Sequence, residues 1–259
     1  MLILKNTKKN LKQNKRIPRI STRGFYDLDS GKTLKKKHYD LYPKKFFDTL
    51  GKFPEFTIMV HGLRNNKSGA LAKFQIAQKR LQQLGYKYPV IGFSYDSNTK
   101  GVQFQSCEIK ATNVGKIIAM KNGKNLSKFI IEFKKKHPHT KIRLMGHSLG
   151  SEVILSALVY LAKKNTTIEY VYFFGSSVPA SVMTQNRLGK FIQKSVLESI
   201  VNYYSPKDEV LKHAYESGII EKPIGYLGIS KKTVPKYLQK KIFPANHRFV
   251  SYIKKLDSY

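Results

Sequence analysis

A serine between two glycines is the pattern in this chain that most directly suggests chemistry. The segment Gly146–Gly150 reads GHSLG; it follows the short apolar run Ile142–Met145 and precedes Val153–Leu161, whose apolar residues recur at helical spacing. This is the G-x-S-x-G pattern on a strand, a tight turn and a helix. Glycines suit a turn that leaves little room for a Cβ atom. The spacing predicts Ser148 as a nucleophile; the alternative is an ordinary strand–helix connection with an idle serine.

A serine hydroxyl becomes a good nucleophile only beside a base that is itself oriented by a carboxylate. Asp208 follows an apolar run at 197–204, on a turn begun by Pro206, and His247 lies late in the chain, just before the last predicted helix. Ser148, Asp208 and His247 therefore occur in the order serine, acid, histidine. We predict that Asp208 orients His247 and that His247 moves the proton.

Other residues could fill these two roles. Asp96 also follows a predicted strand and is the second candidate for the acid, with Glu209 third. His213 is the other histidine after Ser148, but it falls inside the helix predicted to begin at Asp208. Structural interpretations also stand: Asp208 as a helix N-cap, and His247 as a surface histidine.

Acyl transfer also needs backbone N–H groups that stabilise the developing oxyanion. The N–H of Leu149, at the start of the helix, is one predicted donor. The other is expected from the loop after the strand ending in His61-Gly62, with Leu63 first and Arg64 next. We interpret His61 and His147 as structural rather than catalytic residues.

The elements that must position these residues alternate between strand and helix. Buried strands are predicted at 56–62, 88–95, 142–145, 168–174 and 197–204, with helices at 70–84, 107–136 (broken near 122–123), 150–161, 186–194 and 249–256. Such alternation indicates an α/β fold with a mostly parallel sheet flanked by helices. Reactive residues then collect beyond the carboxyl ends of the strands. The Gly- and Pro-containing stretch 217–241 predicts no regular element.

Length and composition favour one globular domain at 25–259 after a basic segment, Met1–Gly24, interpreted as a mobile arm or in part an edge strand through 17–20. The chain has 259 residues and 41% hydrophobic residues, which suits a single large core. One cysteine excludes an internal disulfide and favours a reducing compartment. With no secretory h-region and no apolar run of roughly 20 residues, we expect a cytoplasmic protein.

The formal net charge of +32 comes mainly from lysines scattered along the chain. It suggests attraction to polyanions, and weak association with anionic membranes is the partner it would add. A nucleic-acid partner is not expected, because arginine is scarce and no nucleic-acid motif occurs. A solvated basic surface without a partner is the simpler interpretation. No metal-binding or nucleotide-binding motif occurs either, so neither a metal nor a cofactor is expected.

Four motifs together resemble the α/β-hydrolase superfamily of serine esterases and lipases: VHGL at 60–63, GHSLG at 146–150, SPKDEVL at 205–211 and NHRFVSY at 246–252. The region from 202 on, NYYSPKDEVL and then PIGYLGI, is similar more narrowly to the uncharacterised hydrolases of the DUF726 or DUF900 type. The chain differs from full-size hydrolases in showing no clear first strand pair and no large lid.

The resemblance implies a serine hydrolase that cleaves a carboxylic ester, with a thioester or a lipid ester in the same class, through an acyl-enzyme on Ser148. The alternative function is a non-catalytic protein of the same fold that docks on anionic membrane or nucleic acid through its lysines. The residues alone leave the physiological substrate and the oligomeric state open.

Overall fold

A single eight-stranded sheet organises the computed structural model, which describes residues 17–101, 105–184, 188–230 and 233–259. The strands run in the order β2-β1-β4-β3-β5-β6-β7-β8 across the sheet, and all neighbours are parallel except the antiparallel pair β1–β2. The strands are β1 Arg19–Ser21, β2 Asp40–Tyr42, β3 Glu55–Val60, β4 Val90–Ser94, β5 Lys141–His147, β6 Ile168–Phe174, β7 Val196–Tyr204 and β8 Tyr237–Lys241. The expected mostly parallel α/β architecture is confirmed.

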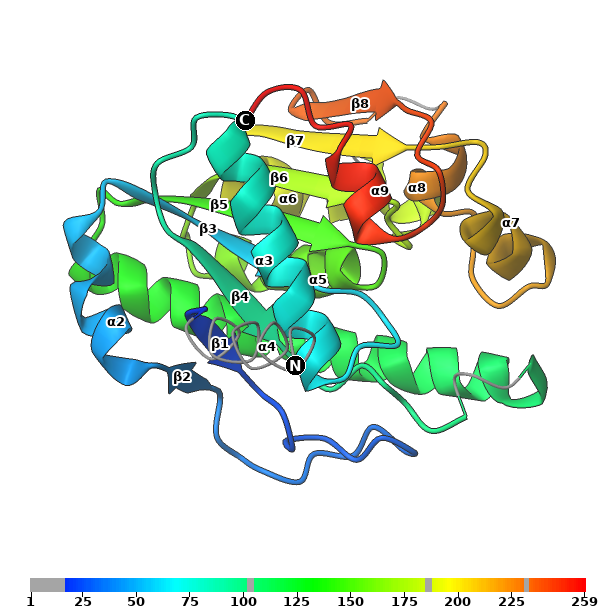
Figure 1. The fold of residues 1–259 in the computed structure, drawn as a ribbon, viewed down its shortest axis with the longest axis horizontal. Helices are drawn as coiled ribbons and strands as arrows, with labels where there is room; N and C mark the ends of the chain where they lie inside the picture. Colours follow the sequence, from blue (N-terminus) through cyan, green and yellow to red (C-terminus); the bar gives the residue numbers. More distant parts are fainter. Residues whose placement is uncertain (1–16, 102–104, 185–187, 231–232) are drawn as a thin grey trace, which may run out of the picture.

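Helices cover both faces of the sheet (Figure 1). Helices α3 (Lys67–Gln83) and α9 (Phe249–Ile253) pack together on one face, while α4 (Glu108–Lys136), α5 (Gly150–Lys163) and α6 (Lys190–Ser195) form the other layer. The remaining helical elements are α2 Lys44–Thr49, α7 Glu209–Glu216, α8 Ile224–Leu227 and the 3-10 turns η1 Leu50–Lys52, η2 Gln105–Cys107 and η3 Ala180–Met183. Within the described ranges, no helix combines the length and the apolar character needed to cross a membrane.

Each strand side contributes to a different apolar core, as the alternation of side chains along a strand requires. Phe56, Ile58 and Val60 of β3 pack into the cluster beneath α4 and α5, whereas Met59 faces the cluster beneath α3 and α9. Because all six residues of β3 are buried, the strand has no solvent-exposed face, as expected of a parallel strand covered on both sides.

The parallel strands end at one edge of the sheet, and the candidate residues follow those ends. The arrows of β5, β6 and β7 point to the same edge in Figure 1. The loops after β3, β5 and β7, which carry Leu63, Ser148 and Asp208, therefore meet there.

Two expectations about elements are corrected, and one further strand is added. A first strand pair exists, because β1 and β2 pair antiparallel. Strand β1 agrees with the alternative of a strand through 17–20, although it lies between β2 and β4 and not at the edge of the sheet. Residues 1–16 of the segment expected to be an arm lie outside the described residues. Helix α4 runs unbroken through Gly123, where a Cβ would overlap Ser156 of α5, so this glycine serves close helix packing and not a break. Strand β8 lies within 217–241, where the sequence predicts no regular element.

Candidate active site

The turn after β5 holds Ser148 in a strained backbone conformation. Its φ angle is +52°, a value that side chains with a Cβ rarely adopt. A Cβ on Gly150 would overlap the carbonyl oxygens of Val60 and His61, and one on Gly146 would lie 2.8 Å from Ile154. Backbone atoms therefore require glycine at 150, while at 146 a Cβ would have to displace the end of the Ile154 side chain. The Ser148 N–H donates to the Phe174 carbonyl at 3.0 Å, which ties the turn to the end of β6.

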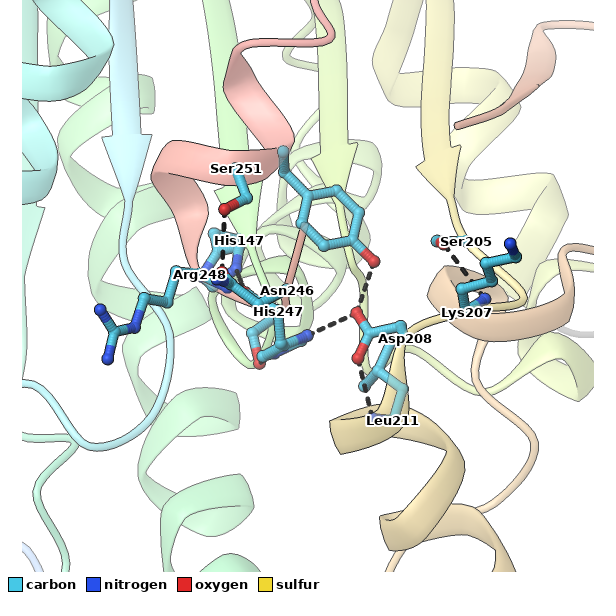
Figure 2. Close-up of polar contacts among 11 residues, drawn as sticks. His147, Ser205, Lys207, Asp208, Leu211, Asn246, His247, Arg248 and Ser251 are labelled. Atoms are coloured by element: carbon cyan, nitrogen blue, oxygen red, sulfur yellow. Dashed lines mark hydrogen bonds and ion pairs between the residues drawn. The ribbon is translucent and has the colours of Figure 1, made fainter. Parts of the chain in front are cut away.

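The side chains of Ser148, His247 and Asp208 form one hydrogen-bonded chain. His247 Nε2 lies 3.0 Å from Ser148 Oγ, and His247 Nδ1 lies 2.7 Å from Asp208 Oδ2 (the second contact is drawn in Figure 2). Since the carboxylate can only accept, Nδ1 carries the proton and Nε2 is free to accept from the serine hydroxyl. The predicted residues, 99 and 39 positions from His247 in sequence, are therefore brought together.

Asp208 is buried and makes three hydrogen bonds. One oxygen accepts from the Leu211 N–H at 3.1 Å and caps α7, and the other accepts from His247 and from the Tyr252 hydroxyl (Figure 2). Burial raises the pKa of Asp208, but the hydrogen bonds from His247 and Tyr252 outweigh it and hold the pKa below its ordinary value. Asp208 therefore stays ionised opposite His247, and its N-cap role coexists with the contact to the histidine.

The loop carrying His247 is held by a hydrogen bond from His147 and by hydrogen bonds that Asn246 accepts within the loop. His147 Nε2 donates to the His247 carbonyl at 2.8 Å, and burial, reinforced by His247, lowers the pKa of His147 well below its ordinary value. His147 is thus neutral, consistent with a structural role. Asn246 Oδ1 accepts from the Arg248 N–H at 3.0 Å and from the Ser251 hydroxyl at 2.8 Å, which turns the chain into α9 (Figure 2).

The segments that carry the two predicted oxyanion donors lie next to each other. A Cβ on Gly62 would lie 2.9 Å from Ser148 Cβ, so the chain just before Leu63 touches the nucleophile. The side chains of Leu63 and Leu149 converge over Gly115 of α4. Neither the Leu63 N–H nor the Leu149 N–H donates a hydrogen bond to any residue that the structure describes. The Arg64 N–H, in contrast, donates to the Ser97 carbonyl at 2.8 Å. Leu63 is thus the better placed of the two loop candidates.

The alternative acids and base lie elsewhere. Asp96 accepts from the Gly24 N–H at 2.7 Å beside β1 and β4. Glu209 is exposed on α7, 3.9 Å from Lys212, and His213 lies 3.8 Å from Glu108. His61 is fully buried and stacks on the Tyr95 ring at 4.6 Å, in keeping with the structural role expected for it.

Sequence reasoning did not single out Tyr252, which donates to Asp208. Its place in NHRFVSY, five residues after His247, was the one sequence feature that linked it to the site. The contact itself depends on α9 folding back over the sheet. Gly175, at the end of β6, is what admits the ring, because a Cβ there would lie 2.9 Å from Tyr252 Cζ. Among the residues with described positions, no group of three His, Cys, Asp or Glu side chains could hold a metal ion.

The serine turn after the central β5 and the chain order serine, aspartate, histidine match the pattern described for α/β-hydrolases. In comparisons with known proteins, the family model "Protein of unknown function (DUF726)" matches residues 110–234, a span that includes Ser148 and Asp208 and ends before His247. No curated protein matches the chain.

Solved structures of hydrolase-like proteins are similar to the chain at low identity. A lipase-esterase related protein from Clostridium acetobutylicum is 14% identical, with a TM-score of 0.43 over 79% of this chain and 91% of that one. Est1E from Butyrivibrio proteoclasticus is 13% identical, with a TM-score of 0.42 over 76% and 80%. MenH from S. aureus is 10% identical, with a TM-score of 0.36 over 75% and 86%.

Proposed function

We propose that this protein is a serine hydrolase that cleaves a carboxylic ester through an acyl-enzyme on Ser148. The observation that carries the proposal is the unbroken hydrogen-bond chain from Ser148 Oγ through the His247 ring to Asp208, at 3.0 and 2.7 Å. A thioester or a lipid ester belongs to the same reaction class. The motif resemblance to serine esterases supports it independently of the geometry.

In the proposed first half-reaction, Ser148 Oγ attacks the ester carbonyl carbon while its proton passes to His247 Nε2. Asp208 stabilises the imidazolium that forms. The carbonyl oxygen becomes an oxyanion, and the N–H groups of Leu63 and Leu149 donate to it. The intermediate collapses when the C–O bond to the alcohol breaks, and His247 gives its proton to the leaving alkoxide.

In the second half-reaction, a water molecule attacks the acyl carbon while His247 accepts a proton from that water. The bond between the acyl carbon and Ser148 Oγ then breaks, and His247 returns the proton to Ser148. The acid product is released and the free enzyme is restored. No cofactor or metal enters either step. A single cysteine suits a reducing compartment, and we propose that the enzyme acts in the cytoplasm.

A fluorophosphonate probe tests the proposal, because it reacts only with an activated serine. We expect covalent labelling of the wild type, together with hydrolysis of p-nitrophenyl esters. Ser148→Ala should abolish both, while Ser258→Ala, which removes an exposed hydroxyl beside Asp257, should retain labelling at Ser148. Equal labelling of wild type and Ser148→Ala would contradict the proposal.

A second candidate is the binding function, and one observation favours it. Two hollows on the α4–α5 side, of about 570 and 400 Å³, are lined by lysines and by no acidic residue among those described. Such surfaces attract anionic lipid. This function would survive Ser148→Ala, and it is compatible with catalysis on the same fold.

A further inference from the structure

Arg23 extends from the end of β1 into the loop that carries Leu63. Its Nη2 donates to the carbonyls of Asn65 at 3.1 Å and Asn66 at 3.2 Å. Its Nε donates to the Ser94 hydroxyl at 2.8 Å, at the end of β4. The planar guanidinium therefore fastens the loop after β3 to the neighbouring strand, a geometry that a lysine ammonium does not reproduce.

The loop in turn fixes one particular peptide unit. The Asn65 side chain donates through Nδ2 to the Gly62 carbonyl at 2.9 Å and to the Leu63 carbonyl at 2.6 Å. The Gly62 carbonyl and the Leu63 N–H belong to the same planar peptide and point in opposite directions. Holding the oxygen thus sets the direction of the N–H that we propose as an oxyanion donor.

Arg23 reaches the same peptide by a second route, through His61. Arg23 Nη2 lies 3.3 Å from His61 Nε2, which also accepts from the Tyr95 N–H at 3.2 Å. With Nε2 accepting, the ring proton resides on Nδ1, which lies 3.0 Å from the Gly62 carbonyl and donates to it. Burial, followed by the charge of Arg23, lowers the pKa of His61 well below its ordinary value, so the ring remains neutral.

The segment bearing Arg23 is itself anchored. Thr22 donates through its hydroxyl to Asn122 Oδ1 of α4 at 2.6 Å, and its N–H donates to the Ser94 carbonyl at 3.0 Å. The N–H of Gly24, the residue after Arg23, donates to the Asp96 carboxylate at 2.7 Å. Asp96 therefore fixes the turn after Arg23 and lies close enough to interact with its charge.

We propose that Arg23 is a positioning residue for the oxyanion donor Leu63, acting through Asn65 and through the proton on His61 Nδ1. The inference rests on the proposed hydrolase function. It makes part of the basic N-terminal segment a component of the catalytic framework and gives this arginine a function other than binding a polyanion.

The test compares Arg23→Gln and Arg23→Lys with Arg19→Gln, each as a single substitution in the full chain. Arg19 is a matched control: it is the preceding arginine in the sequence, lies on β1 itself, and packs over the Tyr42 ring at 4.8 Å, away from the loop. Loss of one oxyanion donor costs about 10²–10³ in kcat. We expect Arg23→Gln, which misaligns a donor without deleting it, to lower kcat for p-nitrophenyl acetate by about tenfold or more with KM within about twofold.

Arg23→Lys should fall between wild type and Arg23→Gln, because the charge remains but the fork is lost. Arg19→Gln should keep kcat within about twofold of wild type. Asn65→Ala should show the same defect in kcat, and its combination with Arg23→Gln should be non-additive, because both act on the same peptide. An Arg23→Gln kcat equal to that of Arg19→Gln, or defects that multiply in the double variant, would overturn the inference.

Hydrogen exchange separates this inference from the proposed function. We expect the peptide covering 61–66 to exchange faster in Arg23→Gln than in Arg19→Gln, with a comparable melting temperature in both. That readout needs no turnover. A wild type that neither hydrolyses esters nor labels at Ser148 would defeat the proposed function, whereas unchanged exchange at 61–66 would defeat the role of Arg23.

Discussion

Asp208 serves two purposes with its two carboxylate oxygens, and this makes it a clean residue to test. One oxygen caps α7 through the Leu211 N–H, and the other faces His247 and Tyr252. Asparagine is as good an N-cap as aspartate. Replacing Asp208 by Asn therefore preserves the helix start but removes the charge that faces His247 and Tyr252.

We predict that Asp208→Asn lowers kcat for p-nitrophenyl esters by about 10³–10⁴-fold, because the amide favours the wrong tautomer of the histidine. Thermal unfolding should show that α7 and the fold are retained. Glu209→Gln, one residue further along and exposed, is the control and should leave kcat unchanged. A fall of less than about tenfold in Asp208→Asn would mean that this carboxylate does not orient the base.

The hydrogen bond from the Tyr252 hydroxyl should stabilise the protein most while Asp208 is ionised. Its hydroxyl is one of the donors that keep the pKa of Asp208 below the ordinary value despite burial. A group with a depressed pKa contributes stability above its unfolded pKa, about 3.9 for Asp, and loses it as the pH falls through the folded pKa. A hydrogen bond to a charged group is worth about 1.5–3 kcal/mol.

We therefore predict that Tyr252→Phe is less stable than wild type by about 1.5–3 kcal/mol at pH 7, and that the difference shrinks below about pH 4. Urea unfolding at pH 7 and pH 3 measures it. Tyr88→Phe, which alters a partly exposed ring elsewhere, is the control. A difference of the same size at both pH values would show that the hydroxyl does not act through the ionised carboxylate.

At the scale of elements, the serine turn depends on how closely α5 approaches β3. The carbonyls of Val60 and His61 occupy the space that a Cβ on Gly150 would need. Both are buried backbone atoms, one in the last residue of β3 and one in the residue that follows it, so they cannot rotate away as a side chain could.

We predict that Gly150→Ala displaces the start of α5, destabilises the protein by about 1–3 kcal/mol and abolishes most labelling at Ser148. Gly69→Ala is the control for stability, since it also lies in a helix near its start, and its Cβ would meet only the side-chain amide oxygens of Asn65 and Asn66 at 3.2–3.3 Å. Chemical denaturation and fluorophosphonate labelling of both variants check the prediction. Wild-type labelling in Gly150→Ala would show that the turn tolerates a Cβ.

Sequence patterns predicted those elements whose apolar residues are periodic and missed those stabilised mainly by polar contacts. Buried apolar runs in the sequence predict the central strands and α5. The chain order of Ser148, Asp208 and His247 was sufficient to predict that these three residues lie together. Strand β8 was missed because YLQKK is mostly exposed at the sheet edge and carries no apolar pattern. Arg23 was missed because its role depends on long-range contacts with the loop after β3.

At the scale of the whole molecule, the charge of +32 is spread over many lysines, so net charge alone does not identify a docking face. The smaller hollow is more specific. Lys35, Lys36, Lys37, Lys121 and Lys124 line it together with Met120 and Tyr160, and Met120 is 61% exposed. Cationic and apolar groups side by side suit the interface of an anionic bilayer, which offers both phosphate and acyl chain.

We predict that the protein sediments with phosphatidylserine-containing vesicles at low salt and is released at high salt, since exposed charges are screened. Each lysine near such a surface contributes about 1 kcal/mol, so Lys35→Gln, Lys36→Gln and Lys124→Gln together should weaken binding by roughly 100-fold. The matched triple variant changes Lys79, Lys87 and Lys255, exposed residues away from this hollow, to Gln. It lowers the net charge equally and should weaken binding far less. Equal loss in both triple variants would show that the attraction is diffuse and that the hollow is not a docking face.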